Sequence, residues 1–119
     1  MKIRVVDIIN SREVVTKIGQ NTSYDAKTAY KLARNIKEIS SELENFDKTR
    51  NNLIIKYGKE NKEGNIEVEK KNTEVFNKEL SDVLGVEVEL NIVTIDPEKL
   101  EGTSPFELLV IDWMLKVEE

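Results

Sequence analysis

The longest regular pattern in the chain is an apolar stripe between residues 24 and 57. No proline or glycine interrupts this segment, and charged or polar residues fill the positions between the apolar ones. The stripe recurs in steps of three and four, at Ala29, Leu32, Ile36, Ile39, Leu43, Phe46, Leu53 and Tyr57, with Arg50 as the one charged member. This spacing predicts a single amphipathic helix over residues 24–57 with a heptad-type seam.

This helix is long for a chain of 119 residues. At about 1.5 Å per residue it would span about 51 Å, whereas a compact domain of this size has a diameter of about 35 Å. Either the rest of the chain packs along the helix in an elongated body, or the seam contacts another subunit. The length of the chain itself predicts a single domain over residues 1–119.

The remaining predicted elements are short. β-Branched or alternating residues predict strands at 2–6, 66–68 and 86–95, and residues 59–65 have the composition of a polar loop. Helices are predicted at 11–18, 73–84 and 105–117, with Asn10, Asn72 and Ser104 as N-caps, and with Thr22 or Ser23 capping the long helix. Together these elements predict a helix-dominated α+β fold with a small two- to three-stranded sheet, antiparallel or mixed.

The last predicted helix, residues 105–117, is apolar on nearly all sides. A surface helix needs only one apolar stripe, and so small a monomer has little left to cover a second one. We therefore expect a homo-oligomer, with Trp113 as its main anchor. The predicted oligomer interface combines this helix with the end of the long helix and consists of Phe46, Arg50, Leu53, Phe106, Leu109, Val110 and Trp113.

Arg50 interrupts the seam and has two interpretations. Its guanidinium can fix the register of an oligomer by pairing with a carboxylate of a neighbour, such as Glu42 or Asp47. Alternatively its aliphatic stem packs in the seam while the guanidinium reaches water.

The composition excludes several kinds of chemistry. The chain has no cysteine and no histidine, so it lacks thiolate nucleophiles, disulfides, the commonest metal ligands and the serine–histidine arrangements of many hydrolases. Its five glycines stand singly rather than in a phosphate-binding loop. Glu87 and Glu89 are two residues apart in a predicted strand and therefore share one of its sides, which is typical of a strand edge that faces water. We predict no catalytic residues, no metal site and no cofactor, and a carboxylate-based enzyme is the least favoured class.

Charge is distributed unevenly along the chain. The net charge is −5, but residues 1–40 carry +4 and residues 41–119 carry −9. A duplex DNA binder normally has a dominant basic face, so DNA is not an expected partner. No apolar run is long enough to span a membrane and the N-terminus lacks the pattern of a secretion signal, so we expect a cytoplasmic protein without a membrane partner.

The N-terminal third contains the best candidate for a ligand site. Free N–H groups at a helix start attract anions, and three basic residues follow Asn21–Tyr24 at helical spacing. An aromatic ring can stack on a base, and an arginine of the preceding helix can close over the ligand. The predicted anion or nucleotide site consists of Arg12, Tyr24, Lys27, Lys31 and Arg34. The alternative is a basic stripe that faces solvent and binds nothing.

Four segments of the chain carry a resemblance. They are Ala29-Tyr30-Lys31-Leu32-Ala33-Arg34-Asn35-Ile36, the stretch from Arg50 to Lys56-Tyr57-Gly58, Phe76-Asn77-Lys78-Glu79-Leu80, and Val86-Glu87-Val88-Glu89-Leu90. Over residues 23–95 the sequence resembles a family of short, mostly uncharacterised proteins encoded by phages and prophages of low-GC Gram-positive bacteria. The resemblance implies a phage context, a host cytoplasm and a small accessory role, and it brings no catalytic residues.

Two functional hypotheses follow. The first is a non-enzymatic phage accessory protein that acts by binding, either sequestering a host signalling nucleotide or blocking a host defence protein. The alternative is a structural or virion-assembly factor that engages another phage protein through its long helix. A nucleotide ligand is expected to stabilise the first kind of protein, whereas the second is expected to ignore nucleotides.

Overall fold

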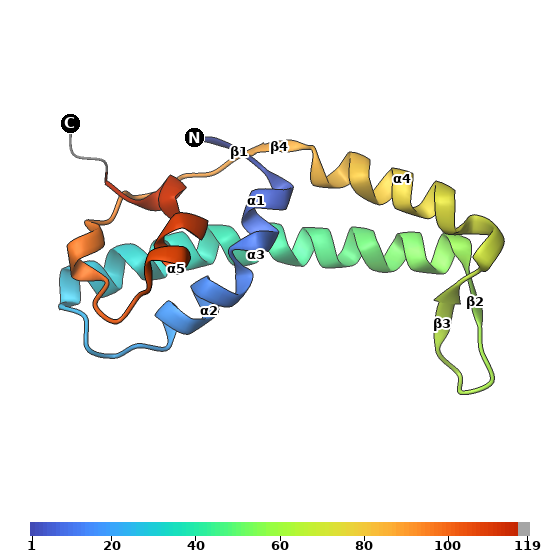
Figure 1. The fold of residues 1–119 in the computed structure, drawn as a ribbon, viewed down its shortest axis with the longest axis horizontal. Helices are drawn as coiled ribbons and strands as arrows, with labels where there is room; N and C mark the ends of the chain where they lie inside the picture. Colours follow the sequence, from blue (N-terminus) through green and yellow to red (C-terminus); the bar gives the residue numbers. More distant parts are fainter. Residues whose placement is uncertain (117–119) are drawn as a thin grey trace.

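A single long helix organises the molecule. The computed structural model describes residues 1–116, and its extents are 50 × 30 × 23 Å. Helix α3 (Ala26–Tyr57) has 32 residues and runs along the longest dimension (Figure 1). The predicted long helix and the helix-dominated α+β class are therefore confirmed. The rest of the chain packs along α3, so the elongated body of the two sequence-based alternatives is the observed one.

Local chemistry sets both ends of α3. Asp25 caps the helix, and its carboxylate accepts a hydrogen bond of 2.8 Å from the Thr28 N–H. The prediction that Thr22 or Ser23 is the cap is wrong, because Ser23 forms a local turn in which its N–H and hydroxyl donate to the Asn21 side chain. At the other end, a Cβ on Gly58 would lie 2.2 Å from the Ile54 carbonyl oxygen, so only glycine fits the turn there.

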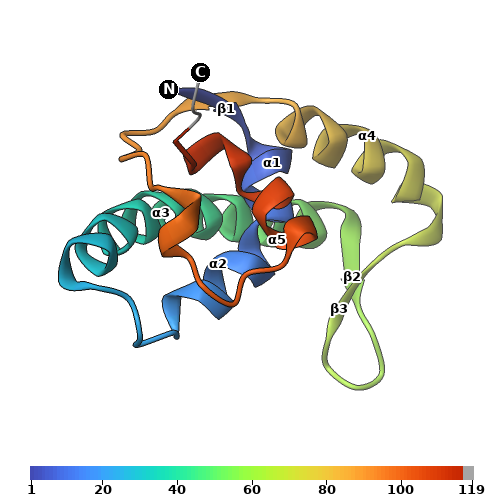
Figure 2. The same ribbon diagram turned by 60° about the vertical axis from the view of Figure 1, so that its left-hand side comes forward.

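The first half of α3 is covered by a compact head. Its elements are β1 (Lys2–Arg4), α1 (Val5–Asn10), α2 (Arg12–Gly19), β4 (Glu87–Glu89), the 3₁₀ turns η2 (Pro97–Lys99) and η3 (Asp112–Met114), and α5 (Pro105–Val110). Strands β1 and β4 pair antiparallel with Ile3 opposite Val88, and a parallel bridge joins Ile95 to Leu115. The core gathers Ile3, Ile8, Val15, Ile18, Leu32, Ile39, Leu90, Ile95, Leu100, Ile111 and Met114. Figure 2 shows these elements grouped around one half of α3.

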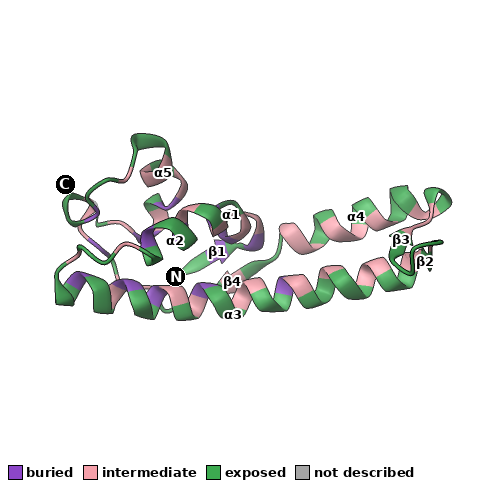
Figure 3. Ribbon diagram, turned by 90° about the horizontal axis from the view of Figure 1, so that it is seen from below, coloured by how far each residue is buried: buried purple, intermediate pink, exposed green. Residues whose placement is uncertain are grey.

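The second half of α3 forms an arm with far less cover. Helix α4 (Thr73–Leu84) runs back along it, and the hairpin of β2 (Gly58–Glu60) and β3 (Ile66–Val68), followed by the 3₁₀ turn η1 (Lys70–Asn72), occupies the far end (Figures 1 and 3). None of the residues of α4 is fully buried. The head thus has a three-dimensional core, whereas the arm is a single layer of two helices.

A buried asparagine anchors the head to α3. The Asn35 side chain is fully buried, and its amide N–H donates to the Val93 carbonyl at 2.8 Å. The Val93 N–H donates back to the Asn35 side-chain oxygen, also at 2.8 Å. In the first half of α3, the residues that face the head include Asn35 and Thr28, which are both buried. Ala29 is exposed, so the prediction that Ala29 belongs to the seam is wrong.

The sheet differs from the predicted one. Strand β3 pairs with β2, which lies in the segment predicted to be a loop, and β1 pairs with β4, so two separate two-stranded sheets form. Val5 and Val6 belong to α1 rather than to the first strand, because Val5 is buried in the head at the turn from strand to helix. The predicted strand over 86–95 is reduced to β4, since the Asn35 amide rather than a strand holds Val93.

Two predicted caps and one helix end are also corrected. Asn10 is the last residue of α1, and the Asn72 side chain donates to the Tyr57 carbonyl instead of capping α4. The capping box of Ser104 and Glu107 is confirmed. Helix α5 ends at Val110, earlier than predicted, because Ile111 leaves the helical conformation and enters the core. Residue 117, the predicted end of this helix, lies outside the described residues.

Candidate functional site

The most exposed apolar side chains of the head lie on α5. Phe106 is 82% exposed and Leu109 is 66% exposed. The helix that carries them has six residues and is held at its start by the capping box, in which the Glu107 N–H donates to the Ser104 hydroxyl and the Ser104 N–H donates to the Glu107 carboxylate. Lys17 of α2 also donates to both carboxylate oxygens of Glu107, at 2.8 and 2.9 Å. These apolar side chains are therefore presented on a fixed helix.

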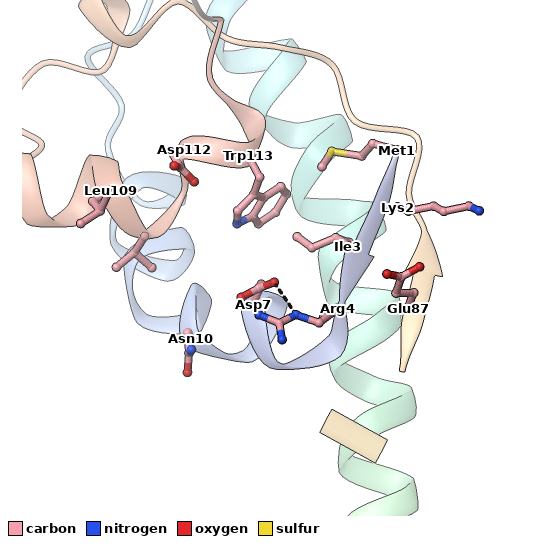
Figure 4. A pocket seen from close by; sticks show the side chains of 11 residues that line it. Met1, Lys2, Ile3, Arg4, Asp7, Asn10, Glu87, Leu109, Asp112 and Trp113 are labelled. Atoms are coloured by element: carbon pink, nitrogen blue, oxygen red, sulfur yellow. Dashed lines mark ion pairs between the residues drawn. The ribbon is translucent and has the colours of Figure 1, made fainter. Parts of the chain in front are cut away.

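A hollow of about 510 Å³ lies beside α5 (Figure 4). Its apolar lining comes from Met1, Ile3, Leu109, Val110 and Trp113. Polar side chains surround these residues and come from β1, α1, β4 and η3: Lys2, Arg4, Asp7, Asn10, Glu87 and Asp112. Arg4 and Asp7 form an ion pair of 3.5 Å at this rim. We call Phe106, Leu109, Val110 and Trp113 the α5 face.

Trp113 has an unsatisfied polar atom. Its side chain packs against the core, and its indole nitrogen is covered but has no acceptor among the residues that the structure describes. In Figure 4 the ring lies between Ile3 and Asp112, with the nitrogen on the side of α5 and α1. A buried N–H without an acceptor costs about 1–3 kcal/mol, so an acceptor brought by another molecule would be favourable here.

The acidity of Glu107 predicts how pH affects the α5 anchor. The hydrogen bonds from Lys17 and from the Ser104 N–H lower the pKa of Glu107 from 4.5 to about 2. A carboxylate with a lowered folded-state pKa stabilises the fold fully above its unfolded pKa and loses that contribution as pH falls through the folded value. We expect the stability difference between wild type and Glu107→Gln to be constant above about pH 5 and to vanish towards about pH 2. Urea unfolding across this range measures it, and a difference that does not change with pH would contradict the role of the ion pair.

The structure separates the two halves of the predicted oligomer interface. Phe46 is buried, and Arg50 and Leu53 are half-buried on the part of α3 that α4 covers, whereas the α5 face belongs to the head (Figure 3). Arg50 lies over the Phe46 ring, 5.9 Å from its centroid, and pairs with Asp47 of its own helix at 3.6 Å. This is the geometry of the second interpretation of Arg50, with a packed stem and a guanidinium that reaches the surface.

The predicted anion site is only partly assembled. Lys27 and Lys31 line a cleft of about 460 Å³ at the start of α3, but Arg34 lines a neighbouring hollow with Tyr30. Tyr24 packs against the core instead of facing the cleft. The expected closure by Arg12 is wrong, because Arg12 pairs with Asp47 at 2.9 Å, and Asp47 lies 20 residues beyond Lys27, or about 30 Å along α3.

Two lysines that the sequence did not suggest complete this cleft. Lys99 is the last residue of η2, and its ammonium lies 3.9 Å from the Asp25 carboxylate. Lys116 is placed by its N–H, which donates to the Ile95 carbonyl at 2.8 Å. Both come from segments remote from α3 in the chain, so no local spacing predicts them. Hydrogen bonding to the Thr28 side chain, and then to the Thr28 N–H, lowers the pKa of Asp25, the residue that already occupies the helix N-terminus. We call Lys27, Lys31, Lys99 and Lys116 the lysine cleft.

The described residues form neither a metal-binding cluster nor a membrane-spanning helix. Within residues 1–116 no three acidic side chains are grouped closely enough to hold a metal ion, and no helix combines the length and apolar character needed to cross a membrane. Comparison of the chain with protein-family models, with curated proteins and with solved structures gave no match. The α5 face and the lysine cleft are therefore the two features that bear on function.

Proposed function

We propose that this chain is a non-enzymatic binding protein that docks another protein on its α5 face. The observation that carries the proposal is the 82% exposure of Phe106 on a helix that a capping box and an ion pair hold in place. Large aromatic side chains are usually covered, and those that anchor interfaces sit beside apolar pockets with polar rims. The α5 face and its hollow have this anatomy.

The chemistry around Trp113 indicates which group a docked protein would supply. A docked segment fills the hollow beside Leu109 and Val110, and one of its backbone carbonyls accepts a hydrogen bond from the Trp113 indole after a small tilt of the ring. In the phage setting that the family resemblance implies, the partner is a host defence protein whose surface is blocked, or a virion protein.

Photo-crosslinking from position 106 tests this proposal. A photoreactive phenylalanine analogue in place of Phe106 is expected to capture a discrete second protein in the cells that produce the chain. Because Phe106 is already exposed, the substitution should leave the fold unchanged.

The lysine cleft supports a second candidate function, the capture of a small anionic nucleotide. Four ammonium groups from three segments surround about 460 Å³ at the start of α3, together with the carboxylates of Asp25 and Asp96. Among the described residues, Lys27, Lys31 and Lys116 have no carboxylate within 4.0 Å, so their charges are available to phosphate oxygens. A sequestering protein needs no catalytic group, only such a site.

Nucleotide binding predicts a shift in melting temperature. A ligand at about 100 times its dissociation constant adds about 2.7 kcal/mol, which raises the melting temperature of a domain of this size by about 10 °C. We expect this shift with adenine or guanine nucleotides, linear or cyclic, and its loss in the Lys27→Ala/Lys31→Ala/Lys99→Ala variant. Lys48→Ala, an exposed lysine farther along α3, is the matched control. An equal shift in the triple variant, or no shift in wild type, would remove this candidate.

A further inference from the structure

One side of α3 carries a narrow stripe of uncharged polar residues, which Glu42 and Lys48 border on its two sides. Ser41, Asn45, Thr49 and Asn52 are all exposed and recur in steps of three and four, so they share one side of the helix. Charged residues make up 34% of the chain, yet none of these four positions is charged. Depletion of charge is what distinguishes the centre of a protein interface from the rest of a surface. We call this surface, with Glu38 and Lys56 at its two ends, the lateral face.

An apolar hollow borders the lateral face between α3 and the end of α4. It measures about 160 Å³, and its lining combines the apolar Val5, Phe46, Val83, Val86 and Val88 with one carboxylate, that of Glu42. Val86 is 48% exposed. Asn45 and Thr49 stand at its edge, and the Thr49 hydroxyl donates to the Asn45 carbonyl at 2.9 Å, which satisfies the hydroxyl within the helix. A helix lying on the lateral face would cover this hollow.

The charges at the two ends of the lateral face are of opposite sign. Glu38 and Lys56 are 18 residues apart, or about 27 Å along the same side of α3. A second copy placed antiparallel about a twofold axis near residue 47 brings Glu38 opposite Lys56 of that copy, twice. The same axis brings Asn45 opposite Thr49. Moving the register by one turn in one direction would place Arg34 opposite Lys56, which is repulsive. Moving it in the other direction would place Glu42 opposite Lys56 and would carry Glu38 beyond the end of α3 of the second copy, so that the pairs of Glu38 are lost.

From this complementarity we propose that two copies of the chain associate through their lateral faces, with the α3 helices antiparallel. Each Lys56 already lies 3.7 Å from Glu79 of its own α4, so in the pair it stands between two carboxylates. With α4 on an adjacent side of each α3, the two arms form a four-helix arrangement of the kind found in antiparallel bundles.

Cysteine cross-linking tests the register. The chain has no cysteine, so an Asn45→Cys/Thr49→Cys variant carries only the two thiols under test. Mild oxidation is expected to yield a covalent dimer of about twice 13.7 kDa, because residue 45 of one copy lies opposite residue 49 of the other. Glu44→Cys/Lys48→Cys is the matched control, since these exposed residues lie about 100° farther round the helix. Equal cross-linking of both variants would overturn the proposed interface.

Charge reversal tests the pairing independently of covalent trapping. In sedimentation of the full chain, Glu38→Lys and Lys56→Glu are each expected to weaken the dimer about ten-fold, and the double variant is expected to restore it. A wild-type chain that remains at 13.7 kDa, or a double variant that is not rescued, overturns the proposal. Phe106→Asp should leave the dimer unchanged, so failure here is distinguishable from failure of the α5 face.

Discussion

Replacement of Asn35 by alanine is expected to lower the free energy of unfolding by about 3 kcal/mol. The substitution leaves both the N–H and the carbonyl of Val93 without the partners that they have at 2.8 Å, in a place where Asn35 itself is fully buried. Each buried polar group left unpaired costs about 1–3 kcal/mol. Because Val93 precedes the Ile95 bridge to Leu115, the change should also loosen the chain that carries the lysine cleft.

Urea unfolding measures the loss, and hydrogen exchange of the Val93 amide locates it. Asn51→Ala is the matched control, because Asn51 lies on the same helix with its side chain exposed, and such substitutions usually change stability by less than about 0.5 kcal/mol. If Asn35→Ala were no more destabilising than Asn51→Ala, the anchor between α3 and the head would not have the importance that we give it.

The second large effect concerns partner binding. We expect Phe106→Asp combined with Leu109→Asp to weaken binding of the protein partner at least about 100-fold, because truncating or charging an anchor residue commonly costs 2–4 kcal/mol. Both side chains are exposed in the free protein, so the unfolding free energy should hardly change.

Quantitative co-purification from the producing cells measures this effect. Tyr30→Asp is the matched control, since Tyr30 is an apolar ring with the same 66% exposure as Leu109 but lies on α3. A partner recovered equally with the Phe106/Leu109 variant and with wild type would show that binding does not use the α5 face.

The features that could be predicted from the sequence are those with a local cause. The long helix follows from an apolar stripe along a segment without proline or glycine, and the capping box of Ser104 and Glu107 follows from their spacing. The length of α3 against the size of the chain left two alternatives, an elongated body or a seam that contacts another subunit, and the single chain has the elongated body. In each case the residues that determine the feature are neighbours in the chain, so their spacing contains the information.

The features that escaped prediction depend on partners far away in the chain. Nothing around Asn35 indicates that the backbone of Val93 will satisfy its side chain, so the sequence does not predict a polar residue at this place in the seam. Ala29 was likewise predicted to lie in the seam, where the structure buries its polar neighbour Thr28. The cap at Asp25 was missed because Thr22 and Ser23 have equally suitable side chains.

The candidate sites show the same division. Phe106, Leu109, Val110 and Trp113 were predicted as interface residues from the apolar excess of their segment, and as a binding surface they remain a prediction. The lysine cleft was half predicted: Lys27 and Lys31 have helical spacing, whereas Lys99 and Lys116 reach the cleft only through the fold. Arg12 was misplaced because the crossing point of α2 over α3 is a tertiary property.

Photo-crosslinking from position 106 is the most direct test of the central claim, that the α5 face docks a different protein. A photoreactive phenylalanine analogue at position 106 should give one discrete adduct that contains another protein, whereas the same analogue at Tyr30, which is comparably exposed, should not. An adduct of about twice 13.7 kDa that contains only this chain, equal adducts from both positions, or none from position 106 would contradict the claim.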